Sequence, residues 1–286
     1  MDNIRLKPID IEHEISKEYF KKKYLKANKP VILKDFSRNW DALDKWDYEY
    51  LKKGCGQVEV PLYDEAFANS DNDYLQESKK MKFGEYLNLI ENKPTKLRMF
   101  LFNVIKYMPY LKNDFSFPDL GVKYIKSHPF LFVGGRDAYV DIHYDLDHSH
   151  VFLTQIKGKK KVILYSNEDS KNLYQHPFTV SCNIDFRNPD LNRYPKLKNL
   201  QGFTHTLEPG ETIFIPSCWW HYIEYSTDGI SLTLRAMPDG ITAKAKGLIS
   251  IFKLKIVDHY VGKLLGSKKW YDIKEKWAHN RAQQGS

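Results

Sequence analysis

Cysteine is scarce in this chain of 286 residues. The three cysteines, Cys55, Cys182 and Cys218, lie far apart and form no C-x-x-C pair. This spacing excludes a disulfide framework and a structural zinc knuckle, and it fits a reducing compartment. The fold must therefore be held together by its hydrophobic core.

Long apolar runs are missing as well. The opening stretch "MDNIRLKPIDIEHE" carries charges every few positions and has no apolar segment of the kind found in export signals. Elsewhere no uncharged apolar run approaches the roughly 20 residues that a membrane helix needs. We therefore expect a soluble, cytoplasmic protein with no membrane association.

The chain also lacks internal repeats, low-complexity tracts and linkers long enough to separate independent domains. It is rich in hydrophobic residues (42%) and aromatic residues (14%), which excludes a disordered protein. These features predict one globular body. A basic tail follows that body: residues 241–286 hold ten Lys or Arg and three acidic residues, so they carry seven of the eight net positive charges.

The hydrophobic pattern predicts a mainly β fold. Helical periodicity occurs over 16–27, with Ser16 as the cap, over 40–53 and over 81–91. From about residue 129, short β-branched and aromatic runs alternate with Gly, Pro and Asp turns. We place strands at "FLFVG", "AYVDIHYD", "VFLTQIK", "KKVILY", "FTHTLE", "ETIFIP", "WHYIEYS" and "ISLTLRAM", after an early strand in "PVILKDF".

Eight short strands without helices between them predict a double-sheet jelly roll, that is, a double-stranded β-helix. Helical periodicity returns over 241–265 and 270–281. We therefore divide the chain into three parts. Residues 1–128 form an N-terminal elaboration, 129–238 form the jelly-roll core and 239–286 form a C-terminal helical tail.

The segment "HYDLDHSH" at 143–150 has the composition of a metal site. Because side chains alternate along a strand, His143 and Asp145 point the same way and can bind one ion. His221 follows 76 residues after Asp145, in "EPGETIFIPSCWWHYIEY", where Gly210 makes a turn and Pro216 ends a strand. This second stretch resembles the second cupin motif. Two histidines and one carboxylate form the facial triad that suits non-haem Fe(II) oxygenases.

The run from "HYD" through "FLTQIKGKKKVILYS" to "IPSCWWHYIEY" resembles the JmjC family of cupin-fold oxygenases, most closely its asparaginyl hydroxylase branch. The similarity is strongest over 130–236. It implies an Fe(II)-dependent hydroxylase that converts the cosubstrate 2-oxoglutarate to succinate as it oxidises a C–H bond. By the same analogy, the substrate is a side chain of a protein or peptide.

The resemblance also implies a cation for the distal carboxylate of 2-oxoglutarate. The family's lysine falls on Lys160, and its neighbours in the sequence then face outward. Arg235 replaces a family asparagine; it either binds a carboxylate of the cosubstrate or leans into solvent. Two further departures each lose a hydroxyl: Val140 replaces a threonine, and Phe100 aligns with a tyrosine.

The other polar side chains of 143–150 have less specific roles. Asp147, His148 and His150 are expected to line or cover the pocket entrance, and either histidine could instead bind substrate or make a supporting hydrogen bond. Trp219 shares the strand parity of His221 and is expected to pack beside the metal.

Two other functions remain open at this stage. JmjC-like enzymes also act on modified tRNA bases and on small molecules, so an RNA-directed or small-molecule hydroxylase is an alternative. The departures at Val140, Phe100 and Arg235 keep open a metal-binding cupin without turnover that serves as a binding module.

The tail suggests self-association. Leu248, Phe252, Ile256 and Tyr260 recur every four residues and, with Ile249 and Leu264, form an apolar stripe. The stripe either folds back on the core or pairs with the same helix of a second subunit. We expect a homodimer through the C-terminal helices, and we rank nucleic-acid binding below both alternatives.

Overall fold

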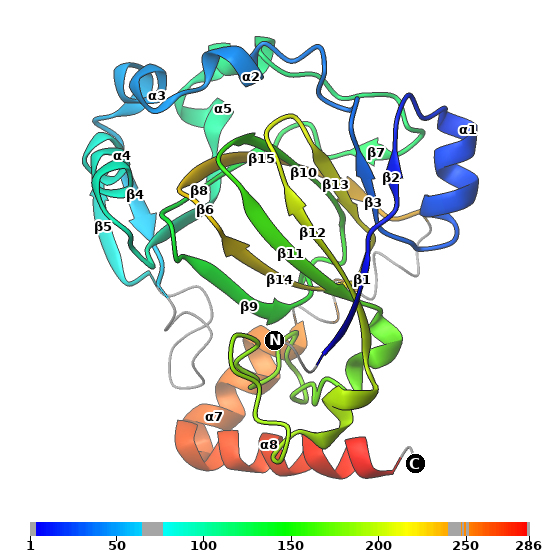
Figure 1. The fold of residues 1–286 in the computed structure, drawn as a ribbon. Helices are drawn as coiled ribbons and strands as arrows, with labels where there is room; N and C mark the ends of the chain where they lie inside the picture. Colours follow the sequence, from blue (N-terminus) through cyan, green and yellow to red (C-terminus); the bar gives the residue numbers. More distant parts are fainter. Residues whose placement is uncertain (1–3, 65–76, 240–246, 248, 250–251, 285–286) are drawn as a thin grey trace.

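Two β-sheets face each other at the centre of the molecule (Figure 1). The computed structural model describes residues 4–64, 77–239, 247, 249 and 252–284. Within them, the smaller sheet has the strand order β1-β12-β11-β14-β9, and the larger has the order β2-β3-β13-β10-β15-β8-β6, with β7 beside β15. All eight strands predicted from residue 129 onward are present, so the jelly-roll expectation is confirmed.

The strands have the following bounds. The smaller sheet contains β1 (Arg5–Pro8), β9 (Tyr139–His143), β11 (Lys160–Tyr165), β12 (Gln201–Leu207) and β14 (Trp220–Tyr225). The larger contains β2 (Ile11–Glu12), β3 (Val31–Leu33), β6 (Arg98–Asn103), β7 (Lys123–Tyr124), β8 (Phe130–Gly134), β10 (His150–Lys157), β13 (Thr212–Ile215) and β15 (Gly229–Met237). A separate hairpin pairs β4 (Glu59–Leu62) with β5 (Lys79–Lys82).

Alternation along the strands divides the side chains between the barrel interior and the outer layers. In β10, Val151 and Leu153 join the interior cluster with Val162 and Leu164 of β11, whereas Phe152 points to the other face. The turn from β10 to β11 needs Gly158. Its φ is +75°, and a Cβ there would lie 2.0 Å from the carbonyl oxygen of Asp228.

N-terminal helices cover the outer face of the larger sheet. Ser16 caps the first helix as expected, because its hydroxyl accepts the amide of Tyr19 at 3.2 Å. Phe20 packs its ring 4.9 Å from that of Phe214 on β13. These helical elements are α1 (Lys17–Phe20), η1 (Lys21–Leu25), α2 (Ala42–Lys45), α3 (Tyr48–Cys55), α4 (Phe83–Asn92), α5 (Val104–Tyr107) and η3 (Pro109–Asn113).

The single helix predicted over 40–53 is wrong. The chain leaves helical geometry at Trp46, and Asp47 then caps a new helix, α3, by accepting the amide of Tyr50 at 2.7 Å. Aspartate favours such a cap over a helix interior, since its carboxylate competes for backbone amides.

The C-terminal helices lie below the smaller sheet in Figure 1. They are η6 (Lys253–Asp258), α7 (His259–Leu265) and α8 (Ser267–Gln283). Most of 241–251, including Leu248, lies outside the described residues. Ala278 and Ala282 of α8 pack into the core cluster on this side of the molecule, which also contains Ile142 and Trp220. The helix predicted over 270–281 is therefore present, three residues longer at its start.

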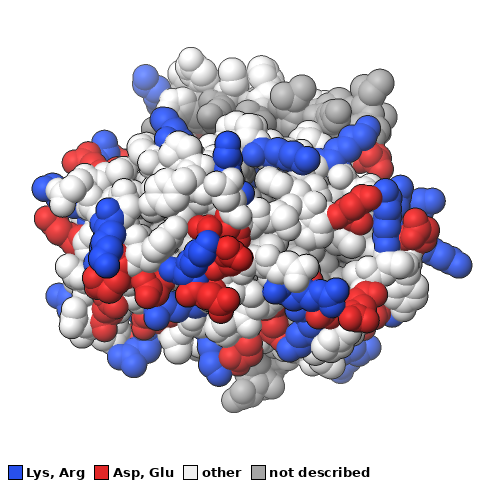
Figure 2. Space-filling view, turned by 90° about the horizontal axis from the view of Figure 1, so that it is seen from above, with Lys and Arg blue, Asp and Glu red and all other residues white. Residues whose placement is uncertain are grey.

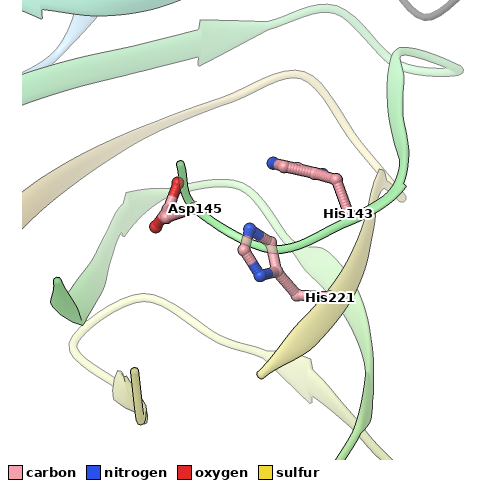
Figure 3. Close-up of side chains that lie close together, drawn as sticks. All are labelled: His143, Asp145 and His221. Atoms are coloured by element: carbon pink, nitrogen blue, oxygen red, sulfur yellow. The ribbon is translucent and has the colours of Figure 1, made fainter. Parts of the chain in front are cut away.

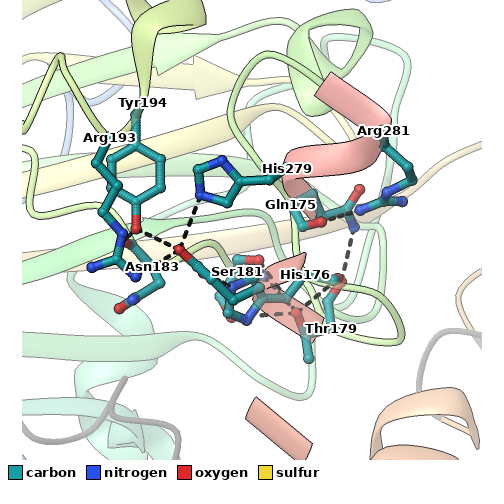
Figure 4. A network of polar contacts seen from close by, with 10 residues as sticks. Gln175, His176, Thr179, Ser181, Asn183, Arg193, Tyr194, His279 and Arg281 are labelled. Carbon is teal, nitrogen blue, oxygen red and sulfur yellow. Dashed lines mark hydrogen bonds and ion pairs between the residues drawn. The ribbon is translucent and has the colours of Figure 1, made fainter. Parts of the chain in front are cut away.

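A polar network fixes α8 to the long connection between β11 and β12 (Figure 4). That connection includes η4 (Asn167–Ser170) and η5 (Pro195–Asn199). Glu275 of α8 accepts hydrogen bonds from His176 at 2.7 Å, from Arg193 at 2.8 Å and from Tyr194 at 2.8 Å. Among the helices in the described part of the chain, none combines the length and the apolar character needed to cross a membrane.

Candidate metal centre

Two neighbouring strands bring three potential metal ligands together. His143 ends β9, and His221 stands opposite it on the antiparallel strand β14. Asp145 follows β9 by two residues. One ligand atom from each of the three side chains lies within 4.8 Å of the others, and the side chains point toward a common space (Figure 3). Sequence spacing predicted these three residues together, and the structure places them together.

Both imidazoles are oriented for metal binding. Nδ1 of His143 donates to the carbonyl oxygen of Asp141 at 2.8 Å, and Nδ1 of His221 donates to that of Trp219 at 3.0 Å. Because a carbonyl only accepts, each Nδ1 carries a proton, so in the neutral imidazole the lone pair is on Nε2. Burial, followed by the proximity of His221, lowers the pKa of His143 to about 3. The neutral imidazole that a metal requires is therefore the stable form at neutral pH.

The carboxylate of Asp145 is ionised. Burial alone would raise the pKa of Asp145, but the positive charge of Arg235 and its hydrogen bond outweigh that effect and lower it. Nη2 of Arg235 lies 3.0 Å from Oδ1 of Asp145. Two neutral imidazoles and one ionised carboxylate form a donor set that fits a divalent transition metal such as Fe(II). The chemistry of these residues therefore fits the predicted cofactor.

A buried lysine lies inside the same barrel. Lys160 is only 1% exposed, and its Nζ donates to Oγ of Ser231 at 2.6 Å and lies 4.1 Å from the ring centre of Tyr225. Burial moves the pKa of Lys160 well below its usual value. No carboxylate of the described residues lies within 4.0 Å of this ammonium group. Its neighbour Lys159 faces solvent and pairs with Glu208 at 2.9 Å.

Val140 and Phe100, the two positions where an apolar side chain replaces a hydroxyl of the family pattern, also lie in the barrel. Val140 packs against the interior cluster. Phe100 contacts Phe132 with ring centres 6.3 Å apart, and Phe132 in turn lies 5.9 Å from Nζ of Lys160.

Two polar residues beside Lys160 were missed in the sequence. Ser231 accepts a hydrogen bond from Lys160 and donates to Oε1 of Gln155 at 2.7 Å, so the three side chains form a polar chain. Strand alternation could have identified Ser231, because it has the same parity in its strand as Arg235 and therefore faces the barrel interior.

The remaining predicted pocket residues have different surroundings. His150 is a correction: it lies on the outer face of β10, its ring centre is 5.6 Å from that of Phe214, and its Nδ1 accepts the amide of Ser217 at 3.0 Å. His150 is the first residue of β10, and strand alternation points its side chain away from the barrel interior. It is therefore a buried histidine of the outer layer. Burial lowers the pKa of His150 to about 4.

His148 lies in the loop between β9 and β10, with a φ of +54°, and its ring packs edge-on against that of Tyr144. Trp219 is in the interior cluster, where its ring lies 5.8 Å from that of Phe203. Its indole donates to the carbonyl oxygen of Asn28 at 2.9 Å. The backbone carbonyl of Trp219 accepts the hydrogen bond from Nδ1 of His221, so Trp219 orients this histidine through its backbone.

Arg235 points inward rather than into solvent. Besides Asp145, its guanidinium binds Asp147: Nη1 lies 2.9 Å from each carboxylate oxygen. The side chain of Arg235 is 11% exposed. Its terminal nitrogens thus contact two carboxylates of the chain at the place where a carboxylate of the cosubstrate was expected.

Comparison with known proteins agrees with this architecture. Residues 16–236 match the model of the cupin-like domain family. The chain is 28% identical over 222 residues to lysine-specific demethylase 8 of Xenopus tropicalis, covering 74% of this chain and 48% of the relative. It is 28% identical over 237 residues to Jumonji C domain-containing protein 5 of Drosophila melanogaster, covering 76% and 57%.

A third relative matches over most of its own length. The chain is 25% identical over 253 residues to tRNA wybutosine-synthesizing protein 5 of Homo sapiens, covering 79% of this chain and 77% of the relative. By contrast, the chain spans about half the length of the demethylase and Jumonji C relatives. The match to the family model covers most of the jelly roll and includes His143, Asp145 and His221. This chain belongs to the cupin-like domain family.

Proposed function

We propose that this chain is an Fe(II)- and 2-oxoglutarate-dependent dioxygenase that hydroxylates a side chain of a protein or peptide. The observation that carries the proposal is the combination of the His143, Asp145 and His221 cluster with the buried side chain of Lys160 in one barrel. A relative named as a demethylase and the resemblance to asparaginyl hydroxylases support a protein substrate.

In this proposal the three clustered side chains hold the metal through Nε2 of each histidine and one oxygen of Asp145. Fe(II), when bound, supplies the redox chemistry that activates dioxygen. Three protein ligands would leave room at the metal for the cosubstrate and dioxygen. Neutral imidazoles and one carboxylate leave the centre a formal charge of +1, which favours an anionic cosubstrate.

Lys160 then binds the distal carboxylate of 2-oxoglutarate. A buried ammonium with one neutral hydrogen-bond partner is costly, and an incoming carboxylate compensates it. Ser231 orients the amino group of Lys160 by accepting its hydrogen bond, and Gln155 in turn orients the hydroxyl of Ser231. Phe100 and Val140 keep the surrounding wall apolar, which excludes water and strengthens this ion pair.

The proposal is tested by succinate formation. Purified full-length protein is supplied with Fe(II), 2-oxoglutarate and dioxygen, and succinate is measured with and without candidate peptides. We expect a basal rate in the absence of substrate and none for Asp145→Ala. A metal-loaded protein that binds 2-oxoglutarate but forms no succinate under any condition is instead a cupin binding module without turnover.

RNA is the second candidate substrate. The relative named tRNA wybutosine-synthesizing protein 5 aligns over most of both chains, and residues 241–286 carry a net charge of +7. On the face that bears the N-terminal helices, however, basic and acidic side chains are interspersed (Figure 2). Stimulation of succinate formation by tRNA, but not by peptides, would establish this alternative.

We also propose a homodimer and a three-part organisation, with 1–128 packed on the core of 129–238 and with 239–286 providing the subunit contact. Exposed apolar side chains on the C-terminal helices support the contact. Phe252 is 56% exposed and Tyr260 is 58% exposed, and Ile249, Ile256 and Leu264 are exposed as well. We place the protein in the cytoplasm, where its three free cysteines stay reduced.

A further inference from the structure

One arginine binds two aspartates that are two residues apart. Nη2 of Arg235 bonds to Oδ1 of Asp145 at 3.0 Å, and Nη1 bonds to both oxygens of Asp147 at 2.9 Å. Nη1 also lies 3.2 Å from Oγ of Ser149, which itself donates to Asp147 at 3.0 Å. The two carboxylates therefore sit at opposite ends of one guanidinium group.

The contacts divide the carboxylate oxygens unequally. Both oxygens of Asp147 are occupied by the guanidinium, and Oδ1 receives the amide and hydroxyl of Ser149 as well. Only Oδ1 of Asp145 is occupied; among the described residues, no side chain or backbone amide donates to its Oδ2. One oxygen of Asp145 thus remains available to the cluster with His143 and His221.

The second aspartate is a competitor for the metal. Divalent metals bind carboxylate oxygens readily, and Asp147 follows Asp145 by only two residues in a loop. A second carboxylate at the centre would occupy a fourth coordination position and cancel its remaining positive charge. Both changes would weaken chelation of an anionic cosubstrate.

We propose that Arg235 sets the carboxylate count of this metal centre: it holds Asp147 outside the coordination sphere and turns Asp145 so that it offers one oxygen. The inference rests on the proposed function, since it concerns the same metal. Arg235 is then a positioning residue. It acts through Asp145 and Asp147 and does not touch the cosubstrate.

The test compares full-length wild type with R235Q, D147N and the double variant R235Q/D147N. Glutamine removes the charge of Arg235 at similar length, and asparagine keeps the shape of Asp147 while making it a poor ligand. Mn(II) affinity is measured by calorimetry on metal-free protein, and 2-oxoglutarate affinity is then measured on the Mn(II)-loaded protein without iron. Circular dichroism verifies that each variant is folded.

We expect R235Q to bind Mn(II) more tightly and 2-oxoglutarate more weakly, each by about tenfold, the scale of effects from residues that support metal ligands. D147N alone should show no gain in Mn(II) affinity, and the double variant should lose the gain of R235Q. An arginine that merely orients Asp145 would behave differently: R235Q would lower Mn(II) affinity, and D147N would not restore it. That result would overturn the inference.

The failure of this inference is distinguishable from failure of the proposed function. Wild-type protein that binds both Mn(II) and 2-oxoglutarate, with R235Q indistinguishable from it, overturns the inference alone. Wild-type protein that binds no divalent metal overturns the proposed function, and the inference with it.

Discussion

The ammonium group of Lys160 lies 2.6 Å from the hydroxyl of Ser231, inside the barrel and out of reach of any carboxylate among the described residues. Sequence separates the two residues by 71 positions. Their contact joins the two sheets, since Lys160 begins β11 and Ser231 lies in β15. Among the described residues, this amino group has one hydroxyl and the ring of Tyr225 as partners, so its positive charge is costly until an anion binds beside it.

Lys160→Met therefore has opposite effects on binding and on stability. We expect the affinity of the metal-loaded protein for 2-oxoglutarate to fall at least about 30-fold, because losing one partner of a buried ion pair costs about 2 kcal/mol or more. The ligand-free variant should unfold at a higher temperature, because an apolar side chain of similar volume replaces an uncompensated charge. Calorimetry and thermal unfolding measure the two effects. Lys159→Met, at the exposed neighbouring position, should change neither, and unchanged cosubstrate affinity in Lys160→Met would show that another group binds the anion.

Asp145→Ala should remove most of the metal affinity. The loss should exceed the roughly 10- to 100-fold cost of removing a residue that only supports a ligand. Calorimetric titration of metal-free protein with Mn(II) measures it. His128→Ala, which removes an exposed histidine that is not part of the cluster, is the control. Metal binding that survives in Asp145→Ala would place the ion on other side chains.

Glu275 makes the docking of α8 sensitive to acid. Burial alone would raise its pKa, but hydrogen bonds from His176 and Tyr194 lower it to about 2, compared with an ordinary value of 4.5. A carboxyl whose pKa is depressed by folding stabilises the protein above pH 4.5, and this contribution is lost as the pH falls toward 2.

We therefore expect Glu275→Gln to lower the free energy of unfolding by about 2 kcal/mol at pH 7, as when charge-assisted hydrogen bonds are lost. The difference from wild type should shrink as the pH falls below 4.5. Denaturant unfolding at pH 7 and at pH 3.5 measures this, with Asp272→Asn on the exposed side of α8 as the control. A difference that is independent of pH would mean that the carboxylate charge contributes nothing.

The exposed apolar side chains of the C-terminal helices predict a dimer that charge can disrupt. In the double variant Ile256→Glu/Tyr260→Glu, two carboxylates would have to be buried in the subunit contact, so we expect a monomer by light scattering where wild type is a dimer. Lys268→Glu, an exposed change of charge on α8, should remain dimeric. A wild-type chain that is monomeric at tens of micromolar would refute the homodimer.

Sequence pattern predicted the core of the fold because the relevant information is local. Strand alternation and the Gly and Pro turns located eight strands, and alternation with motif spacing located His143, Asp145 and His221. Local pattern could not predict β1, whose partner β12 lies almost 200 residues away. It also missed the break at Trp46, where capping by Asp47 outweighs helical periodicity.

The partners of Arg235 were beyond sequence reasoning for the same reason. The residue lies 90 positions from Asp145 and 88 from Asp147, so its inward direction depends on the closure of the barrel. His150 was assigned to the pocket because it belongs to a cluster of polar residues in the sequence. Because β10 begins at His150, one residue earlier than predicted, strand alternation points this side chain away from the pocket.

The parallel pairing of β1 with β12 protects an open edge of the smaller sheet against strand addition. β1 is the outermost strand in this sheet order, and it presents Arg5 and Lys7 before it ends at Pro8, features that discourage further backbone pairing. Without those residues, the backbone of β12 from Gln201 to Thr204 would become an exposed edge. Shortened versions of the chain that begin after Pro8 should therefore aggregate through their sheets, even if the metal centre itself forms correctly.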